Sequence, residues 1–512
     1  MNPSRRLTRL LLALCLSAPA AVAPAATETP RPAAVAGDFY PADRQQLANA
    51  VKSYLRDAMP GGPEPPVALI CPHAGYLYSG QIAADAYRQA MGHDYDVVVI
   101  VGVNHRTEGF YGVSVYDGPG YATPLGVARC DRELARTLRD LDKRFVYRAD
   151  VHAVEHSVEV QVPFVQTILP GTPIVTAVIG GASRDLWLKF GDALAAVLGP
   201  RKALLVASSD LSHYPPHDAA ETSDHAVLAA VATLDPDAVI DTIQDVERRH
   251  LPDLVTCACG EGPIVAVMSA ARQLGATRAT VVSYANSGDT SVGDWQRCVG
   301  YGAVALTKGD RAPDTSILEM PPPPPALPGE RLAAGERRAL LDFARKTLEQ
   351  YFAAGTLPLA RGLPPALQRK QGAFVTLKSQ GRLRGCIGHM ADDRPLAQVV
   401  GAMAVSAAFD DHRFTPLQSQ EMKLIDIEIS VLTPFAPIAS ADDIVLGRDG
   451  VLIRKSGRSA VYLPQVATEQ GWDRDELLRH LCRKANLPAD AWREGAQLLT
   501  FQAEVFGEDK RR

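Results

Sequence analysis

Three histidines stand directly after apolar runs of the sequence. Residues 67–70 (VALI) lead to His73, residues 96–102 (DVVVIVG) to His105, and residues 203–209 (ALLVASS) to His213. Ligands of open α/β sheets bind beyond the carboxyl ends of the strands. Because parallel strands bring these ends to one edge, we expect the three imidazole rings to lie close together. Imidazole binds late first-row transition metals and also transfers protons near neutral pH.

Two further segments add groups with related chemistry. Glu155 and His156 precede one predicted helix, and Cys257 and Cys259 precede another. Thiolate binds the same metals as imidazole, and two histidines with one thiolate leave coordination positions open. Spacing alone does not choose the ligands among His73, His105, His156, His213 and Cys259. For each histidine alone, a hydrogen-bonded structural role is the simpler explanation, and a disulfide between Cys257 and Cys259 would remove the sulfur ligand.

The elements that must position these residues are predicted from their periodicity. Continuous apolar runs are typical of strands that are buried on both faces of a parallel sheet. They cover 67–70, 96–102, 173–180, 203–209 and 279–285, and helical patterns between them include 43–58, 81–91 and 159–168. The pattern predicts an α/β fold, a layered and mostly parallel sheet with flanking helices. After residue 332, a helix at 335–352 and strands at 373–378, 425–432, 460–463 and 499–506 predict a smaller α+β domain.

Composition changes mark four segments in the 512 residues. Residues 1–25 combine three arginines, a short apolar run and an Ala23-x-Ala25 site, which predicts a cleaved secretory signal and a periplasmic or secreted protein. A short membrane anchor is the alternative for this segment. Residues 309–332 contain five prolines in a row and predict a stiff linker between domains at 30–308 and 333–510.

Composition also excludes some classes of function. The net charge is −5, from 53 basic and 58 acidic side chains without a basic cluster, so we expect no nucleic-acid partner. Beyond the signal there is no apolar segment of about 18 residues, so we expect no integral membrane span. Seven cysteines remain after the signal, too few over this length for a disulfide scaffold.

The first domain resembles the Memo family, which is similar in fold to class III extradiol dioxygenases. The matching stretches are GDFYP (37–41), CPHAGYLYSG (71–80), GVNH (102–105), EHSVEVQVPF (155–164), SSDLSHY (208–214) and CGEGPI (259–264). The resemblance implies metal ligands at His73, His105 and Cys259, with Glu155 and His156 in support. It also implies an acid/base role for His213, and Asp210 in the same stretch is the second candidate catalytic residue. A cysteine in place of the carboxylate ligand of the dioxygenases is a departure from their iron site.

The second domain resembles AMMECR-type domains, through LRGCIGHM (383–390), SAAFDDHRFTPL (406–417), IEISVLTP (427–434) and YLPQVA (462–467). In prokaryotes the two domain types accompany a radical-SAM protein in the AmmeMemoRadiSam group, so the chain resembles that group's proteins B and A fused. The resemblance therefore implies a radical-SAM protein as a partner. Within this domain Cys386 lies between Arg384 and His389, and nearby cations favour a reactive thiolate. A buried strand cysteine is the alternative.

Three functions follow from these residues. The first is a metal-dependent oxidoreductase resembling a dioxygenase, with Fe²⁺ as cofactor, a small-molecule substrate and His213 moving a proton. The second is a binding module without catalysis that holds copper or iron and passes it to a metal acceptor, while the second domain recruits a partner; a soft thiolate favours Cu(I). The third is a hydrolase in which His73 activates Cys259 as a nucleophile.

Overall fold

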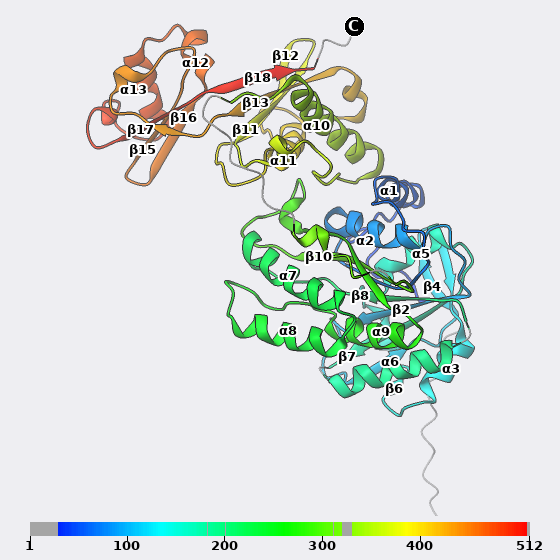
Figure 1. Cartoon of the computed structure of the whole chain (residues 1–512). Coiled ribbons are helices and arrows are strands. Elements are labelled where there is room, and N and C mark those ends of the chain that lie inside the picture. The colour runs from blue at the N-terminus through cyan, green and yellow to red at the C-terminus, as the bar shows by residue number, and fades with distance from the viewer. Residues whose placement is uncertain (1–28, 182, 200, 311, 320–329, 509–512) are drawn as a thin grey trace, which may run out of the picture.

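The computed structural model describes residues 29–181, 183–199, 201–310, 312–319 and 330–508. The predicted signal at 1–25 and the proline run at 321–325 lie outside the described residues. The chain forms a larger N-terminal domain around one wide sheet and a C-terminal part built on two smaller sheets (Figure 1).

The centre of the N-terminal domain is a group of four parallel strands, as predicted. In an eight-stranded sheet of order β6-β3-β7-β2-β8-β1-β10-β9, the parallel members are β7 (Ile174–Gly180), β2 (Val97–Val103), β8 (Ala203–Ser208) and β1 (Pro66–Cys71). Successive side chains of a strand point to opposite faces. Along β1, Ala68 and Ile70 join one hydrophobic cluster and Leu69 joins the other, so both faces of the sheet are buried.

The flanking strands run differently from the centre. β9 (Arg278–Asn286) and β10 (Gly300–Thr307) are antiparallel to their neighbours, and so is β3 (Gly112–Val115) to β7. The remaining strands are β6 (Phe145–Val146), parallel to β3, and the separate pair β4 (Gly120–Thr123) and β5 (Gly126–Arg129). The prediction of a parallel strand at 279–285 is therefore wrong, because the chain returns from β9 directly into the adjacent β10.

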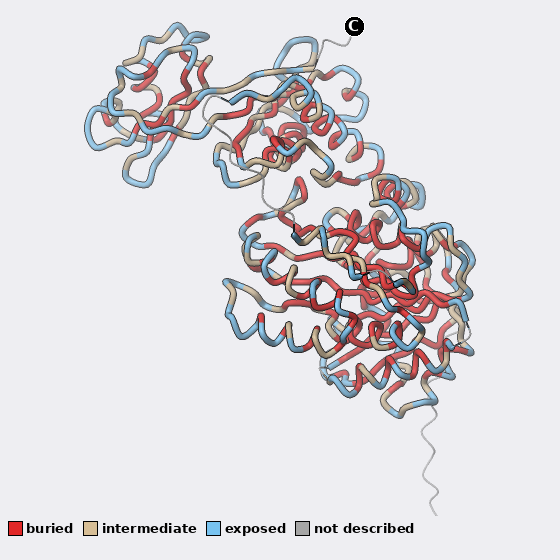
Figure 2. The backbone as a smooth tube through the Cα atoms, in the orientation of Figure 1, coloured by how far each residue is buried: buried red, intermediate tan, exposed pale blue. Residues whose placement is uncertain are grey.

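Helices cover both faces of the sheet (Figure 1). One face carries α1 (Arg44–Arg56), α2 (Tyr76–Ala90) and α5 (Val162–Ile168), and the other carries α3 (Arg132–Arg139), α6 (Arg184–Leu198), α7 (His217–Ala232), α8 (Pro236–Arg248) and α9 (Glu261–Gln273). A short helix, α4 (Ala149–Ala153), lies between β6 and α5. Figure 2 shows the buried backbone concentrated between these layers. The architecture confirms the predicted α/β class.

The C-terminal part is α+β, as predicted, but it divides into two lobes. The first contains α10 (Ala334–Ala354), α11 (Leu396–Phe409) and a sheet of β12 (Arg382–His389), β11 (Ala373–Ser379), β13 (Ile425–Leu432) and β18 (Ala503–Gly507). The second contains α12 (Pro464–Gln470), α13 (Arg474–Lys484) and a sheet of β14 (Ala436–Pro437), β17 (Gln497–Phe501), β15 (Gly450–Lys455) and β16 (Arg458–Tyr462). Both sheets are antiparallel, and each lobe has its own hydrophobic cluster.

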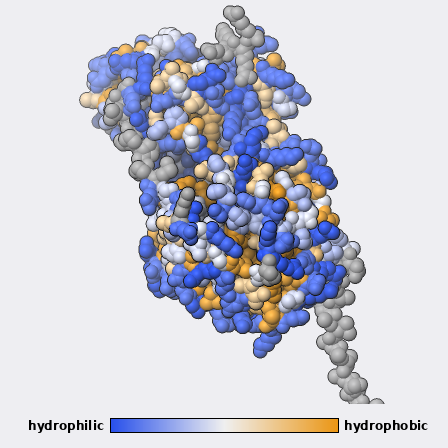
Figure 3. Space-filling view, turned by 45° about the vertical axis from the view of Figure 1, so that its right-hand side comes forward, coloured by the Kyte–Doolittle hydropathy of each residue, from blue (hydrophilic) through white to orange (hydrophobic). Residues whose placement is uncertain are grey.

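The surface agrees with the balanced composition. In the view of Figure 3 most exposed side chains are hydrophilic, and hydrophobic ones gather in smaller areas. Among the helices of the described residues, none combines the length and the apolar character that crossing a bilayer requires.

Candidate metal centre

His73 lies just beyond the end of β1, and hydrogen bonding fixes which of its ring nitrogens carries the proton. Its Nδ1 lies 3.0 Å from Ser208 Oγ at the end of β8. Ser208 already donates its hydroxyl to the carbonyl of Ser157 at 2.6 Å, so it must accept from His73 Nδ1–H. His73 Nε2 therefore keeps a free lone pair. Burial lowers the pKa of His73 well below its usual value, which keeps the ring neutral and able to bind a metal.

His105 follows β2 and is held in the same tautomer by a carboxylate. Glu155 Oε1 lies 3.0 Å from His105 Nδ1, and Glu155 Oε2 accepts the backbone N–H of His105 at 2.7 Å. A carboxylate only accepts, so Nδ1 carries the proton and Nε2 is free. Burial alone would raise the pKa of Glu155, but hydrogen bonding and charge from His105 outweigh it and lower that pKa to about 2. The segment that carries Glu155 packs closely against β2 at Gly102, where a Cβ would lie 2.4 Å from Ser157 Oγ.

Cys259 comes from the loop before α9 and faces His73. Its Sγ lies 3.1 Å from His73 Nε2. Burial, followed by the charge of Asp210, raises the pKa of Cys259 well above its usual value, so the thiol keeps its proton and donates it to Nε2. The loop reaches this depth because residue 260 is glycine: a Cβ there would lie 2.6 Å from Ser209 Cβ.

These three side chains form a donor set that fits a metal ion. The ligand atoms of His73, His105 and Cys259 all lie within 4.8 Å of one another. Neither Nε2 carries a proton, and loss of the thiol proton of Cys259 would release the lone pair of His73 Nε2 and add a thiolate. Such a mixed nitrogen and sulfur set suits zinc, copper and iron better than magnesium or calcium. The His105 side chain is 26% exposed, so the site opens to solvent on that side.

Asp210 and His213 follow β8, and the structure places them beside Cys259. Asp210 Oδ1 accepts the backbone N–H groups of His73, at 2.7 Å, and Ala74, at 3.2 Å, so its carboxylate holds the loop that carries the first histidine. His213 Nδ1 lies 3.0 Å from the Leu211 carbonyl, which leaves its Nε2 free. Asp210, His213 and Cys259 also form a group with ligand atoms within 4.8 Å of one another.

His156 is buried beside the three ligand candidates. Its ring stacks on His105 at a centroid distance of 4.6 Å and lies 5.5 Å from the His73 ring. Burial and the nearby His73 lower the pKa of His156 to about 3, so the ring is neutral. It shares a second group of potential ligands with His105 and Glu155. We place it as a wall of the site, packed against Phe39.

Sequence reasoning missed the buried residues that hold this arrangement. Gln161 donates to Ser208 Oγ and to the Pro72 carbonyl, both at 2.8 Å. Arg31 donates to Glu159 Oε2 at 2.5 Å and to the Glu155 carbonyl at 2.7 Å. Gln161 and Glu159 stand in the EHSVEVQVPF stretch, where polar residues within an apolar run were the available signal. Arg31 gave no signal, because Glu155 and Glu159 lie more than 120 residues away in the sequence.

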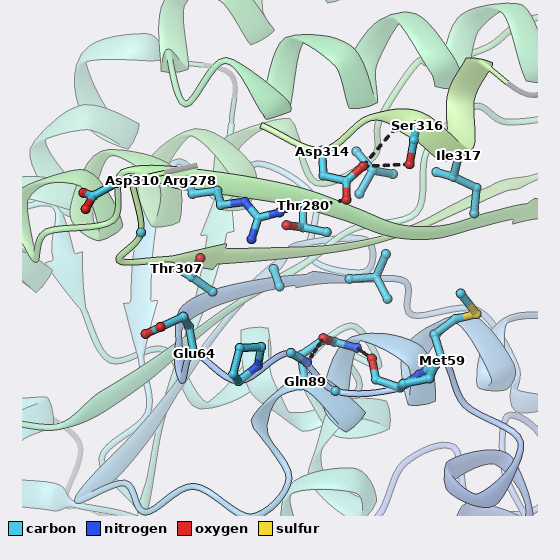
Figure 4. Close-up of a pocket in the computed structure, with 18 residues that line it drawn as sticks. Met59, Glu64, Gln89, Arg278, Thr280, Thr307, Asp310, Asp314, Ser316 and Ile317 are labelled. Carbon is cyan, nitrogen blue, oxygen red and sulfur yellow. Dashed lines mark hydrogen bonds and ion pairs between the residues drawn. The ribbon is translucent and has the colours of Figure 1, made fainter. Parts of the chain in front are cut away.

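One cavity of the N-terminal domain lies away from this centre. It measures about 690 Å³ and opens between the loop at Met59–Glu64 and strands β9 and β10 (Figure 4). Arg278 and Thr307, which line it, lie at the end of the sheet where β1 begins, whereas His73 follows the end of β1. The cavity and the candidate metal ligands therefore lie at opposite ends of β1.

Cys386 of the C-terminal part is half-buried, and its neighbouring cations have other partners. Arg384 pairs with Glu421 at 2.7 Å and His389 with Asp393 at 2.6 Å. The Thr376 hydroxyl donates to Cys386 Sγ at 3.2 Å. The cations predicted to favour a thiolate are thus engaged elsewhere.

Fold and site together define an α/β protein with two histidines and a cysteine at the carboxyl edge of its parallel strands. The sequence model of the family described as Memo-like protein matches residues 31–305, and that of AMMECR1 matches residues 341–506. The chain therefore belongs to the Memo family and carries an AMMECR1 domain after the Memo domain.

Known proteins match about half of this chain or less, over nearly their own full length. A MEMO1 family protein of Methanopyrus kandleri is 35% identical over 54% of this chain and 99% of its own length. A MEMO1 family protein of Aeropyrum pernix is 36% identical over 53% of this chain and 97% of its own length. Among solved structures, an uncharacterized protein from Pyrococcus horikoshii is 36% identical, covers 35% of this chain and 94% of its own, and gives a TM-score of 0.33.

Replacing Glu155 tests whether it orients the second histidine. An amide at this position has one acceptor oxygen, whereas Glu155 accepts from the His105 ring, the His105 backbone and Ser157. We expect Glu155→Gln to weaken metal binding by about 10–100-fold, measured by competition with a chelator. Glu108→Gln, an exposed glutamate three residues after His105, is the matched control and should bind like wild type. Wild-type affinity in Glu155→Gln would refute this role.

Proposed function

We propose that this protein binds a redox-active transition metal, Fe²⁺ in the first instance, between His73, His105 and Cys259, and acts on a small substrate beside it. The observation that carries the proposal is that two imidazoles with unprotonated Nε2 atoms and one thiol place their ligand atoms within 4.8 Å of one another. When bound, the metal supplies redox and Lewis-acid chemistry.

The protein's own groups support a reaction at this place. His213 keeps a free Nε2 and is half-buried, so it can take or give a proton beside the centre. Asp210 holds the His73 loop in position through its backbone hydrogen bonds. The hydrolase alternative is weaker, because burial keeps both Cys259 and His73 neutral rather than as a thiolate and imidazolium pair.

Removing the acid/base group separates catalysis from binding. We expect His213→Asn to retain Fe²⁺ and to lose about 10²–10⁴-fold in turnover, followed as oxygen uptake with catechols and peptides as substrates. His93→Ala is the control, because His93 precedes β2 whereas the candidate ligand His105 follows it. It should leave Fe²⁺ binding and turnover unchanged. Turnover that persists in His213→Asn contradicts the assigned role.

The second candidate function is a metal carrier, which the soft sulfur ligand favours for Cu(I). It predicts bound copper in protein purified anaerobically, transfer of that copper to an acceptor protein, and no turnover with any substrate. Elemental analysis beside the oxygen-uptake assay distinguishes the two functions.

Location and partners belong to the same proposal. The signal-like segment at 1–25 supports export to the periplasm or secretion. The AMMECR1 domain supports recruitment of a partner protein, and a radical-SAM protein of the same group is the partner that the family resemblance suggests.

A further inference from the structure

The AMMECR1 domain rests on the Memo domain at two separate places. At the first, Arg361 forms an ion pair with the fully buried Asp85 of α2 at 2.5 Å and also donates to the Asp57 carbonyl. Lys346 and Gln350 of α10 bind the Asp57 carboxylate at the end of α1. Figure 1 shows α10 beside α1. This contact fixes the two domains together on the side of α1 and α2.

The second place, here called the Trp295 contact, joins the loop between β9 and β10 to three residues of the AMMECR1 domain. Gln398 lies in α11, Arg394 just before α11, and Lys370 just before β11. Gln398 of α11 donates to Asp289 Oδ1 at 2.9 Å. The cations of Lys370 and Arg394 lie 5.9 and 5.7 Å from the centre of the Trp295 ring. Cations at such distances from an indole face attract it. The AMMECR1 domain therefore contacts two residues of this loop of the Memo domain.

The same two loop residues also hold the start of α7. Asp289 Oδ1, which binds Gln398, lies 3.0 Å from His217 Nε2. The Trp295 ring stacks on the His217 ring at 3.9 Å with an angle of 6° between their planes. His217 is thus held by two residues that the AMMECR1 domain also contacts.

The segment before His217 is the loop that carries His213, and it is bonded to the same loop along its length. The backbone N–H groups of Leu211, Tyr214 and His217 donate to the carbonyls of Gly300, Cys298 and Trp295, at 2.8, 2.6 and 2.9 Å. In return, the N–H groups of Gly300 and Cys298 donate to Ser212 and Pro215. Five backbone hydrogen bonds therefore join residues 211–217 and 295–300 into one unit, and His213 itself also bonds to the backbone of Val255 and Thr256.

This unit is locally strained at the position after His213. Tyr214 has a φ of 74°, a backbone conformation that residues other than glycine rarely adopt. Such a conformation persists only where the surroundings hold it in place. The backbone bonds to 295–300, the bonds of His213 to Val255 and Thr256, and the contacts of His217 together supply that hold.

We propose that the AMMECR1 domain, docked through Gln398, Lys370 and Arg394 on the Trp295 contact, holds residues 211–217 in the conformation that presents His213 to the metal centre. Gln398 and Trp295 are then positioning residues that act through Asp289 and His217. The functional meaning of this coupling rests on the acid/base role proposed for His213, whereas the coupling itself does not require a metal.

Hydrogen exchange of the full chain tests the coupling without metal or substrate. In Gln398→Ala, and more strongly in a variant that combines Gln398→Ala with Lys370→Ala and Arg394→Ala, we expect amide protection of residues 211–217 and 295–300 to fall on the order of tenfold. Strand β1 should keep its protection. Gln418→Ala, an exposed glutamine of the same domain that bonds only within its own loop, is the matched control.

A second readout reports on His213 itself. Modification of its ring by diethyl pyrocarbonate, followed by mass spectrometry, should become faster in the same variants and not in Gln418→Ala. Unchanged protection at 211–217 in the combined variant would overturn the proposal, and so would a uniform loss of protection across the Memo domain. Because neither readout involves a metal, absence of bound metal would count against the proposed function alone.

Discussion

Cys259→Ser should release the metal. The sulfur lies 3.1 Å from His73 Nε2 and provides the only soft donor of the set with His73 and His105. A serine hydroxyl ionises far less readily than a thiol, so no anionic ligand replaces it. We expect the affinity for Fe²⁺ to fall by more than the roughly 100-fold that loss of an orienting neighbour costs, and the affinity for Cu(I) to fall further.

The neighbouring cysteine offers a close control for this experiment. Cys257 lies two residues earlier in the same loop, but its Sγ approaches the Ile243 carbonyl at 3.9 Å rather than the site. Both cysteines are free thiols in the structure. Cys257→Ser should bind metal like wild type. Equal binding by both variants would remove Cys259 from the ligand set.

Glu159→Gln should strongly lower the free energy of unfolding. Its carboxylate is completely buried and accepts from Arg31, from the backbone of Ala34 and Val35, and from the Tyr40 hydroxyl. An amide leaves the guanidinium of Arg31 without a counter-charge and turns an NH₂ group toward several donors. Removing one partner of a buried pair costs about 3–5 kcal/mol, so we expect a loss of that size in urea unfolding.

An exposed ion pair provides the comparison for the unfolding measurement on Glu159→Gln. Arg148 and Asp150 pair at 2.5 Å, but both side chains are about half exposed. Asp150→Asn should cost less than about 1 kcal/mol, because water screens and solvates the remaining charge. If Glu159→Gln costs no more than Asp150→Asn, the buried network does not anchor the N-terminal segment. Because Arg31 also binds the Glu155 carbonyl, Glu159→Gln should weaken metal binding as well.

The sequence was sufficient for the parts of the fold that depend on continuous apolar runs. Strands β1, β2, β7 and β8 lie where such runs predict them, since burial on both faces leaves a strong compositional signal. The antiparallel β9 has a continuous apolar run like those of the parallel strands. Its direction and its position at the edge of the sheet were not predictable, because they depend on the connection to β10 and not on the residues of the strand. The division of the C-terminal part into two lobes had no signal, since both lobes use short alternating strands.

The candidate site, like the fold, could be predicted only in part from the sequence. His73, His105 and His213 were predictable from their position after apolar runs, and Cys259 from the family resemblance. The tautomers that direct each Nε2 to one place depend on Ser208, Gln161 and Glu155, whose contacts join distant segments. Coupling to the AMMECR1 domain depends on the contacts of Asp289 and Trp295 with Gln398 and Lys370, which lie about 75–110 residues further along the chain. Side-chain partners of this kind become visible only in three dimensions.

X-ray absorption of the anaerobically Fe²⁺-loaded full chain tests the central claim directly, because it identifies the atoms bound to the metal. We expect one sulfur scatterer and imidazole scattering from two histidines in wild type and in Cys257→Ser, with the sulfur lost in Cys259→Ser and one imidazole lost in His105→Ala. Iron bound only to oxygen and nitrogen in wild type, or a sulfur signal that survives Cys259→Ser, would contradict a metal centre of His73, His105 and Cys259.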